Sequence, residues 1–487
     1  LPPGLQLERP GFWLCTGDTG NTGDTGDTSP PPECEKDSDC PDDGNECTGA
    51  YCDDDGFCKV EYYGGDVSCD DGVFCNGEDY CNGSGQCVAS GEDPCYPYVC
   101  SESSEKCCDP GYAGEDCSVC VRFTDISNSS PEQDGMSWET SFSNLKSSLK
   151  SASDAVGLET WPDRCEVWVA EGRYHVYEGS RDDTLDVMSG VLLYGGFSGV
   201  ESRKEERDIR ENETTIDGRD SAENNRVYHI LTPRSKTVID GFRVVAGVAD
   251  EGGWGADEVN GGGVYAENRE EIELRNMFFV ANGAKEVGGA VYFTGGGGHL
   301  IKNCYFYGNS CDERGGAVAF DNRSSGILQN VVFYNNYAGD YGGGLYVRDE
   351  STVTVYNSTF NGNGADSGNA GAALHAYDSS NVSVVNSIFW GNTLGNEIQA
   401  NGSSKVNVSF TDINKDACGS DSNSDINFSD IITEDPLFLD AENGNLNIGI
   451  NSSCVDAGTS EGDVPEKDIR GLPRDLSPDM GAFEVQK

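Results

Sequence analysis

The second half of the chain alternates short apolar runs with clusters of Gly, Asn, Asp and Ser, and the alternation recurs at a fixed step. The runs are about four to six residues long and rich in β-branched and aromatic residues, which is typical of β-strands; none keeps the 3.6-residue period of a helix. Five copies of Asn-x-x-Phe-x-x-Asn mark the repeat, and successive phenylalanines are 27, 27, 27 and 29 residues apart. They are Phe279, Phe306, Phe333, Phe360 and Phe389.

A second marker keeps nearly the same step. A short glycine- or alanine-rich motif precedes an apolar residue in each copy, as in GGGVY and GGAVY. The apolar positions are Val264, Val291, Val318, Leu345 and Leu374. Because two independent markers stay in phase, the region is a repeat architecture. A step of 27 residues is too short for a four-stranded propeller blade and suits one coil of a parallel β-helix, with three strands and three turns.

In such a coil, residues in register stack about 4.8 Å apart along the axis. We therefore expect the phenylalanines to form an internal aromatic stack and the asparagines beside them to form side-chain amide ladders at the turns. The glycines would allow turns with positive φ. Residues present in every coil are expected to build the coil rather than to catalyse. The flanking asparagines are Asn276, Asn282, Asn303, Asn309, Asn330, Asn336, Asn357, Asn363, Asn386 and Asn392.

The paired markers resemble the repeats of chlamydial polymorphic outer-membrane proteins. More widely, residues 121–487 resemble secreted bacterial right-handed β-helix proteins, through VRFTD (121–125), VWVAEGRY (167–174) and SGVLLYGGFSG (189–199). The end resembles the terminal domain called choice-of-anchor Q, through DPLF (435–438), CVDAG (454–458), DIRGLPR (468–474) and PDMGAFE (478–484). The resemblance implies an all-β, right-handed parallel β-helix (a pectate-lyase-like solenoid) in an extracellular setting, and it implies no particular reaction.

Sixteen of the 21 cysteines lie between Cys15 and Cys120, where large apolar residues are scarce. Such a segment cannot build an ordinary core, which indicates a disulfide framework in an oxidising compartment. The sequence of this segment resembles cysteine-rich repeats of secreted deltaproteobacterial proteins. Within it, CCDPGYAGEDC (107–117) resembles the closing half of an EGF-like module. The predicted framework cysteines are Cys34, Cys40, Cys47, Cys52, Cys58, Cys69, Cys75, Cys81, Cys87, Cys95, Cys100, Cys107, Cys108, Cys117 and Cys120.

The remaining cysteines suggest local pairs in the β-helix region. Cys304 is expected to bond to Cys311, and Cys418 to Cys454. The total is odd, so one cysteine is either free or paired across a symmetric dimer, and Cys165 and Cys15 are the candidates. The bonds of residues 34–120 are expected to stay within that region.

The chain divides into six predicted segments. These are an N-terminal arm (1–15), a Gly/Asp/Thr-rich linker (16–33), the disulfide-rich, EGF-like region (34–120), an N-terminal cap (121–164), the parallel β-helix (165–430) and a C-terminal closing segment (431–487). Within the cap, residues 137–152 carry apolar side chains at helical spacing, which predicts a helix over the first coil. The chain starts without Met or a signal-like segment, which we interpret as a processed mature form.

The arm carries an unusual apolar set for so acidic a chain. One interpretation is strand addition to a neighbouring copy; another is a lipoprotein linker, in which Cys15 would be acylated; a loose tail is the third. The predicted assembly residues are Leu5, Leu7, Phe12, Trp13 and Leu14.

Charge excludes several classes of function. The chain has 85 acidic and 32 basic residues, a formal charge of −53. Nucleic acids and anionic membrane surfaces need a basic partner, so both are excluded as ligands. No run of 18 apolar residues exists, so no transmembrane helix is expected. Ten Asn-x-Ser/Thr sites make glycosylation conceivable, although Asn357 belongs to an expected inward ladder.

The residues argue against catalysis, although β-helices host polysaccharide lyases and hydrolases. None of the four histidines stands in a Gly-His-Gly context, and Lys302 and Arg348 are isolated basic residues. His375 replaces the Tyr or Ala of other copies, so we expect it in solvent or a turn. No catalytic residue and no required cofactor is therefore predicted. The expected function is a secreted structural or adhesive protein that binds copies of itself, with polysaccharide binding or degradation and a lipid-anchored adhesin as alternatives.

Calcium is the one ligand that the acids suggest. The turn before each glycine marker carries an acid, and stacked like charges could be relieved by a divalent cation with oxygen ligands. The rival interpretation is a solvated edge. The candidate calcium ligands are Asp37, Asp39, Asp42, Asp43, Glu286, Asp312, Glu313, Asp340 and Asp366, with Asp257 or Glu258 at the first turn of the column.

Overall fold

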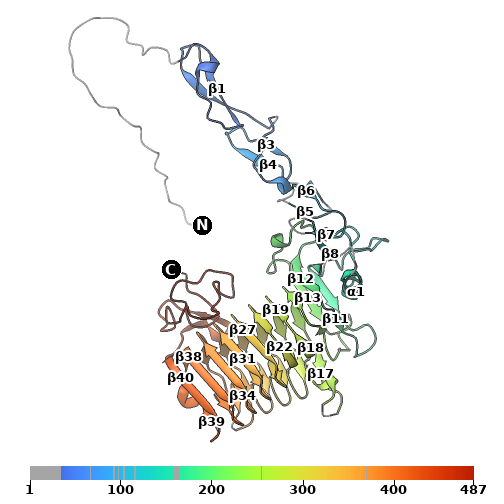
Figure 1. Ribbon diagram of the computed structural model, residues 1–487, viewed down its shortest axis with the longest axis vertical. Helices are drawn as coiled ribbons and strands as arrows, with labels where there is room; N and C mark the ends of the chain where they lie inside the picture. Colours follow the sequence, from blue (N-terminus) through green and yellow to red (C-terminus); the bar gives the residue numbers. More distant parts are fainter. Residues whose placement is uncertain are drawn as a thin grey trace, which may run out of the picture. The chain divides into compact units, whose positions relative to one another are not determined.

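The computed structural model describes residues 34–65, 67–91, 94–96, 98–101, 105–113, 117–157, 164–253, 255–368 and 370–486. In this part the chain forms two compact units (Figure 1), one from residues 34–72 and 78–90 and one from residues 73–77 and 91 onward. The predicted arm (1–15, with Leu5, Leu7, Phe12, Trp13 and Leu14), the linker (16–33) and Cys15 lie outside the described residues.

The first unit is held by cystines. The 3-10 turn η1 (Asp37–Asp39) precedes two antiparallel pairs, β1 (Thr48–Cys52) with β2 (Cys58–Tyr62) and β3 (Asp79–Cys81) with β4 (Cys87–Ala89). None of its described large apolar side chains other than cysteines is buried, so a hydrophobic core is missing and crosslinks replace it. The predicted disulfide framework is confirmed, with bonds Cys34–Cys52, Cys40–Cys58, Cys47–Cys81 and Cys69–Cys87.

The second unit begins with small elements that lead into the β-helix. They are η2 (Phe74–Asn76), β5 (Cys100–Ser101), β6 (Lys106–Cys107) and β7 (Tyr112–Ala113). Its disulfides are Cys75–Cys100, Cys95–Cys107, Cys108–Cys117 and Cys120–Cys165. The boundary expected at residue 120 is therefore displaced, because residues 91–120 belong with the β-helix.

The bond between Cys120 and Cys165 contradicts two expectations. Cys165 was a candidate for the unpaired cysteine, and the bonds of residues 34–120 were expected to stay within that region. The two cysteines face each other in the parallel pair of β8 (Val119–Thr124) and β9 (Cys165–Ala170), with their Cα atoms 4.5 Å apart. That separation allows a disulfide. Only the register of these two strands reveals the pair.

The β-helix carries its strands in three long columns and one short one. Column 1 is β8 (Val119–Thr124), β9 (Cys165–Ala170), β12 (Val191–Phe197), β15 (Thr237–Asp240), β19 (Ile272–Arg275), β23 (His299–Lys302), β27 (Ser325–Gln329), β31 (Thr352–Tyr356), β35 (Asn381–Val385), β38 (Lys405–Ile413) and β40 (Asp425–Ile432). Column 2 is β10 (Gly172–His175), β13 (Thr214–Asp217), β16 (Arg243–Val245), β20 (Phe278–Val280), β24 (Tyr305–Tyr307), β28 (Val332–Tyr334), β32 (Thr359–Asn361) and β36 (Ile388–Trp390).

The other two columns complete each coil. Column 3 is β11 (Leu185–Val187), β14 (Leu231–Pro233), β18 (Val264–Glu270), β22 (Val291–Gly297), β26 (Val318–Asp321), β30 (Leu345–Val347), β34 (Gly371–Ala376), β37 (Asn396–Ala400) and β39 (Gly419–Ser420). Column 4 is β17 (Val248–Ala249), β21 (Gly283–Ala284), β25 (Ser310–Cys311), β29 (Tyr337–Ala338) and β33 (Gly364–Ala365). Pairing within all four columns is parallel, so the predicted parallel β-helix is confirmed (Figure 1).

The repeated phenylalanines form the expected internal stack. All five are fully buried, and neighbouring ring centroids lie 4.4–5.1 Å apart with nearly parallel planes. One residue of each coil therefore sits on its counterpart in the next. The stack contributes apolar burial and ring contacts at every step of the core.

The asparagines after each phenylalanine form the expected amide ladder. Nδ2 of Asn282 donates to Oδ1 of Asn309, and the same bond continues through Asn336 and Asn363 to Asn392 at 2.8–3.1 Å. The last four amides each also donate to a phenylalanine carbonyl, as Asn336 does to Phe306, whereas Asn282 donates to the carbonyl of Val244. The ladder thus gives these backbone oxygens of column 2 a side-chain hydrogen bond.

The asparagines before each phenylalanine turn the chain between columns 1 and 2. Asn276 and its four counterparts have φ of 46–55°, a left-handed conformation that asparagine tolerates well. The first glycine of four markers also has positive φ, for example 70° at Gly288. Gly288 could not carry a side chain there, because a Cβ atom would lie 2.6 Å from the carbonyl oxygen of Val291.

The single helix of the described residues is shorter and later than predicted. The spacing of apolar residues predicted a helix over 137–152, but α1 spans Leu145–Ala155 because Asn144 caps it and accepts a hydrogen bond from Ser147 N. Trp138 lies before the helix, where it packs against Phe123 and Phe197. The helix buries Leu145 and Leu149 in the core of the first coils, so the predicted capping role is confirmed.

The C-terminal segment, residues 431–487, was expected to close the far end. It folds back and lies along the outer face of column 2, with a hairpin of β41 (Phe438–Asp440) and β42 (Asn445–Ile448). Leu446 and Phe483 pack against Val332, and Met480 packs against Ile388. The physical reason is that column 2 has apolar outward residues that need cover. The other 3-10 turns are η3 (Lys204–Glu206), η4 (Asp257–Val259), η5 (Lys415–Ala417) and η6 (Ala441–Asn443).

Candidate functional site

The predicted acidic column exists but does not gather into a cage. Val287, Arg314 and Tyr341 bridge in parallel, which places Glu286, Glu313 and Asp340 in successive coils. Burial raises the pKa of Glu313, and the charges of Glu286 and Asp340 raise it further against the lowering effect of Arg314. Neighbouring carboxylates therefore repel one another along this edge of the β-helix.

The other acids of the column have partners of their own. Glu286 accepts a hydrogen bond from Gly255 N at 3.2 Å, and Asp366 accepts one from the Tyr337 hydroxyl. Asp257 accepts from the hydroxyl of Tyr265 at 2.6 Å, whereas Asp312 is exposed. These carboxylates thus point to separate places rather than to one centre.

The four candidate acids of the disulfide region accept hydrogen bonds from backbone N–H groups. Asp37 accepts from Cys52 N, Asp39 from Lys36 N and Asp42 from Gly44 N. Asp43 accepts from Asn45 N, and this bond, with the one from Thr48, holds its pKa below the usual value. Within the described residues, the groups of three or more possible metal ligands within 4.8 Å consist of cysteines that are in disulfides. Calcium binding therefore stays a prediction.

Two of the four histidines, His299 and His375, are buried. His375 is fully buried, not in solvent or a turn as expected, and its ring lies edge-on to Tyr341 at 4.7 Å. Burial lowers its pKa to about 3, and that of His299 to about 4. Neither is protonated near neutral pH. His175 Nδ1 lies 3.0 Å from the carbonyl oxygen of Arg219, and His229 Nδ1 lies 3.1 Å from that of Gly261.

The cysteine pairs expected in the β-helix are wrong. Cys304, Cys311, Cys418 and Cys454 are all free thiols. Cys304 lies in the main core, whereas Cys311 packs against Ala249 and Ala284 under column 4. Cys418 packs against the last coils of the core, whereas Cys454 belongs to the C-terminal segment. Closeness in sequence therefore does not bring either pair together across the coil.

Two buried carboxyl groups near the last coils were not predicted. Glu397 accepts from Nδ2 of Asn392 at 2.6 Å and so ends the asparagine ladder. Asp412 accepts from the thiol of Cys454 at 3.2 Å, while its second oxygen is buried without a hydrogen-bond partner. Burial raises their pKa values to about 7 and about 6. Nothing in the sequence pattern marks them, because they occupy positions where other coils have different residues.

A groove on the outer face of column 3 is a candidate binding site. It has a volume of about 280 Å³ and is lined by residues of β11, β14, η4 and β18. Tyr265 stacks on His229 with ring centroids 4.9 Å apart, and Asp186 accepts from the hydroxyl of Thr232. Glu267 and Arg269 also face the groove. The lining thus combines aromatic rings with acidic and basic side chains.

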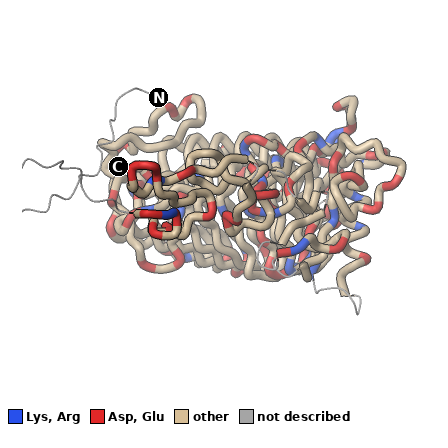
Figure 2. Tube along the Cα trace, turned by 90° about the horizontal axis from the view of Figure 1, so that it is seen from above, with Lys and Arg blue, Asp and Glu red and all other residues tan. Residues whose placement is uncertain are grey.

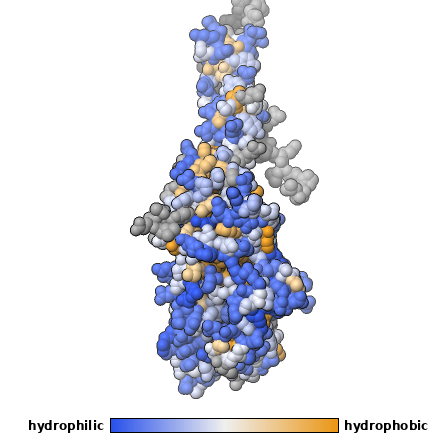
Figure 3. All heavy atoms as spheres, turned by 90° about the vertical axis from the view of Figure 1, so that its right-hand side faces the viewer, coloured by the Kyte–Doolittle hydropathy of each residue, from blue (hydrophilic) through white to orange (hydrophobic). Residues whose placement is uncertain are grey.

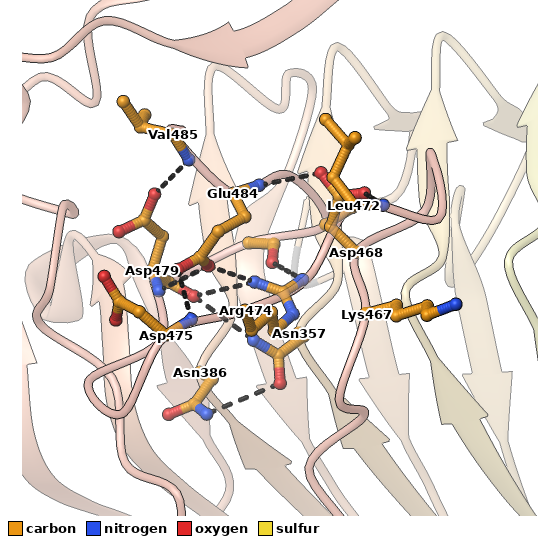
Figure 4. A network of polar contacts seen from close by, with 12 residues as sticks. Asn357, Asn386, Lys467, Asp468, Leu472, Arg474, Asp475, Asp479, Glu484 and Val485 are labelled. Carbon is orange, nitrogen blue, oxygen red and sulfur yellow. Dashed lines mark hydrogen bonds and ion pairs between the residues drawn. The ribbon is translucent and has the colours of Figure 1, made fainter. Parts of the chain in front are cut away.

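The C-terminal segment is fixed to column 2 by a buried polar network (Figure 4). Arg474 donates to Glu484 at 2.9 Å and to the side chain of Asn330 on the β-helix. Asn357 donates to the carbonyl of Asp479, and Asn386 to that of Thr459. The asparagines before the phenylalanines form a second, partial ladder, in which Asn303 donates to Asn276 and Asn386 to Asn357. This second ladder receives the C-terminal segment.

The outer surface is polar and acidic along the described chain. Asp and Glu are spread over turns in both units (Figure 2), and the face seen in Figure 3 is hydrophilic with small separate apolar patches. Within the described residues, no helix has the length and apolar composition that crossing a membrane requires.

Comparison with known proteins supports the fold. Residues 254–429 match the family described as "Right handed beta helix region". Among solved structures, the crystal structure of pectate lyase Pel9A is similar over 75% of this chain and 96% of that chain, at 12% identity and a TM-score of 0.43, a level from which nothing is inferred. No curated protein matches the sequence. The second unit is thus a right-handed parallel β-helix, with a disulfide-rich region before it.

Proposed function

We propose that this chain is a non-enzymatic structural or adhesive β-helix protein that works outside the cell. The observation that carries the proposal is that the polar residues repeated in the coils make structural hydrogen bonds. The amides of both asparagine ladders bond to each other, to backbone or to the C-terminal segment, and two of the histidines are buried and uncharged. The residues that the coils share thus build a rigid rod, and the acidic outer surface is left for contact with partners.

The crosslinks support the extracellular setting. Eight disulfides join described residues, four of them in a unit without a hydrophobic core. Such bonds form and persist in oxidising compartments. Locating the protein by fractionating the source cells and their medium tests this part. Recovery only from the reducing interior, with thiols at these positions, would contradict it.

Self-assembly through the N-terminal arm is the finer part of the proposal. It rests on the apolar residues of the arm, which lie outside the described residues. Deleting residues 1–15 should leave circular dichroism unchanged and abolish higher-order assembly seen by electron microscopy. Assembly that persists without the arm would refute this part. Acylation of Cys15, the lipid-anchored alternative, is tested by mass spectrometry of the native protein.

Polysaccharide binding is a second candidate, and the groove on column 3 favours it. Sugars stack on aromatic rings and bond to flanking polar side chains. The test is co-sedimentation with insoluble polysaccharides, comparing Tyr265→Ala with Tyr307→Ala, an exposed tyrosine of column 2. Loss of binding by the first variant alone supports the groove. Release of soluble sugar products by the unmodified chain would instead support the enzymatic alternative.

A further inference from the structure

The two ends of the β-helix differ in how they are covered. At the N-terminal end, β7 pairs with β8 and α1 packs its apolar face over the first coils. At the other end, β40 is the last strand of column 1 (Figure 1), and within the described residues it pairs with β38 alone. The C-terminal segment, which could have capped this end, lies along column 2 instead. An open strand edge is a template for pairing with another chain.

The hydrogen-bonding groups of β40 alternate between the two sides. Asp425 donates its N–H to Ser404 O beside β38, so residues 425, 427 and 429 direct their backbone groups inward to the sheet. Ile426 and Phe428 therefore direct theirs to the open edge. The side chains of the same two residues are partly exposed and pack against the core of the rod. At this end, backbone hydrogen-bonding groups thus face the open edge, and apolar side chains of the core are partly exposed.

We propose that a second copy of this chain covers this edge, with the two β40 strands antiparallel about a two-fold axis at Asn427. In this register Ile426 of each copy faces Phe428 of the other. Because both residues direct their backbone groups outward, each such pair exchanges two hydrogen bonds. The partly exposed apolar side chains meet on the core side, so the core continues across the axis.

The same register avoids like charges at the contact. Asp425 faces Ser429, and Asn427 faces its own counterpart on the outer surface. A shift that placed Asp425 opposite Asp430 would set two carboxylates side by side, which is unfavourable. Asp430 has φ of 51° and bends the strand, so the straight part of the edge ends at Ser429. A second copy therefore fits by symmetry, and stacking onto the N-terminal end does not, because that end is covered.

The net charge sets the conditions for the contact. Two chains of formal charge −53 repel each other, and salt screens this repulsion. The dimer should therefore strengthen as ionic strength rises. This inference goes beyond the arm of the proposed function, since it needs no residue before β40.

The test is sedimentation velocity of the full chain at low and moderate salt. We expect a monomer–dimer equilibrium that Asn427→Glu weakens about fivefold or more, because it places two charges beside each other on the axis. Asn381→Glu is the matched control: it changes an exposed asparagine of β35, two strands in from the edge, whereas Asn407 of β38 receives a hydrogen bond from Asn427 and would be disturbed with it. Asn381→Glu should leave dimerisation unchanged. A strictly monomeric unmodified chain, or equal effects of both substitutions, overturns the proposal.

A crosslink tests the register itself. Directly opposed residues that do not exchange hydrogen bonds have Cα atoms about 4.5 Å apart, which suits a disulfide. Asn427→Cys should give a covalent dimer under mild oxidation, and Asn407→Cys should not. Changing Phe12 and Trp13 to Asp in the full chain separates this contact from the arm. If that double variant abolishes the dimer while Asn427→Glu does not, the arm makes the contact and the proposal is wrong.

Discussion

Arg474 and Glu484 form an ion pair of 2.9 Å in which each side chain is only 2% exposed. Removing one member leaves the other charged, buried and without its partner. Arg474→Met should therefore lower the free energy of unfolding by about 3–5 kcal/mol, measured by denaturant titration.

The control for this change is an exposed pair. Arg323 contacts Glu350 with both side chains more than half exposed, and Arg323→Met should cost less than about 1 kcal/mol. If the two substitutions have equal effects, the network of Figure 4 does not fix the C-terminal segment.

Glu397 makes stability depend on pH. Burial raises its folded-state pKa to about 7 from the usual value of 4.5. A raised carboxyl pKa contributes stability that is present below pH 4.5 and lost as the pH rises through 7. Glu397→Gln should remove this loss, so its stability relative to the unmodified chain should increase by about 3 kcal/mol between pH 4 and pH 8. Parallel pH profiles would contradict the assignment; Glu442→Gln, an exposed change, is the control.

The asparagine ladder should depend on each of its members. Asn336→Ala removes the partner of the Phe306 carbonyl and of the Asn309 side chain, both buried. We expect a loss of about 2–3 kcal/mol in unfolding free energy. Asn423→Ala, in an exposed turn, should change it by less than about 0.5 kcal/mol. An intact stability of the Asn336 variant would mean that the ladder is dispensable.

Peptide mapping without reduction should recover a Cys120–Cys165 crosslink between the two strands.

The free thiols should differ in reactivity because they differ in burial. In the native protein, alkylation at pH 8 should reach Cys418 before Cys304 or Cys311, because Cys418 is only partly buried and the other two are enclosed. Burial raises the pKa of all three thiols to about 12, so access rather than ionisation sets the order. A recovered Cys304–Cys311 or Cys418–Cys454 peptide would instead restore the pairs that the sequence suggested.

Calcium at the acidic column is tested by melting temperature. The prediction is a rise of the melting temperature with calcium relative to a chelator at fixed ionic strength, which removes general screening. The rise should shrink in Glu313→Gln. An unchanged melting temperature would leave the column as a solvated face.

The sequence by itself determined the periodic part of this protein. Phe306 and Asn309 recur at a fixed step, and a residue repeated once per coil must stack on its counterpart, so the β-helix, the aromatic stack and the amide ladders followed directly. The cystine framework of the first unit followed from the scarcity of apolar residues around its cysteines.

Only the tertiary structure decided the contacts that have no period. Cys165 meets Cys120 because two strands far apart in sequence lie in register, and Cys304 misses Cys311 because seven residues carry the chain from the main core to the interior of column 4. Arg474 meets Asn330 only after the C-terminal segment folds back along column 2. Local patterns report spacing along the chain, whereas these contacts depend on which faces the coils leave uncovered, and that is settled when the whole rod is built.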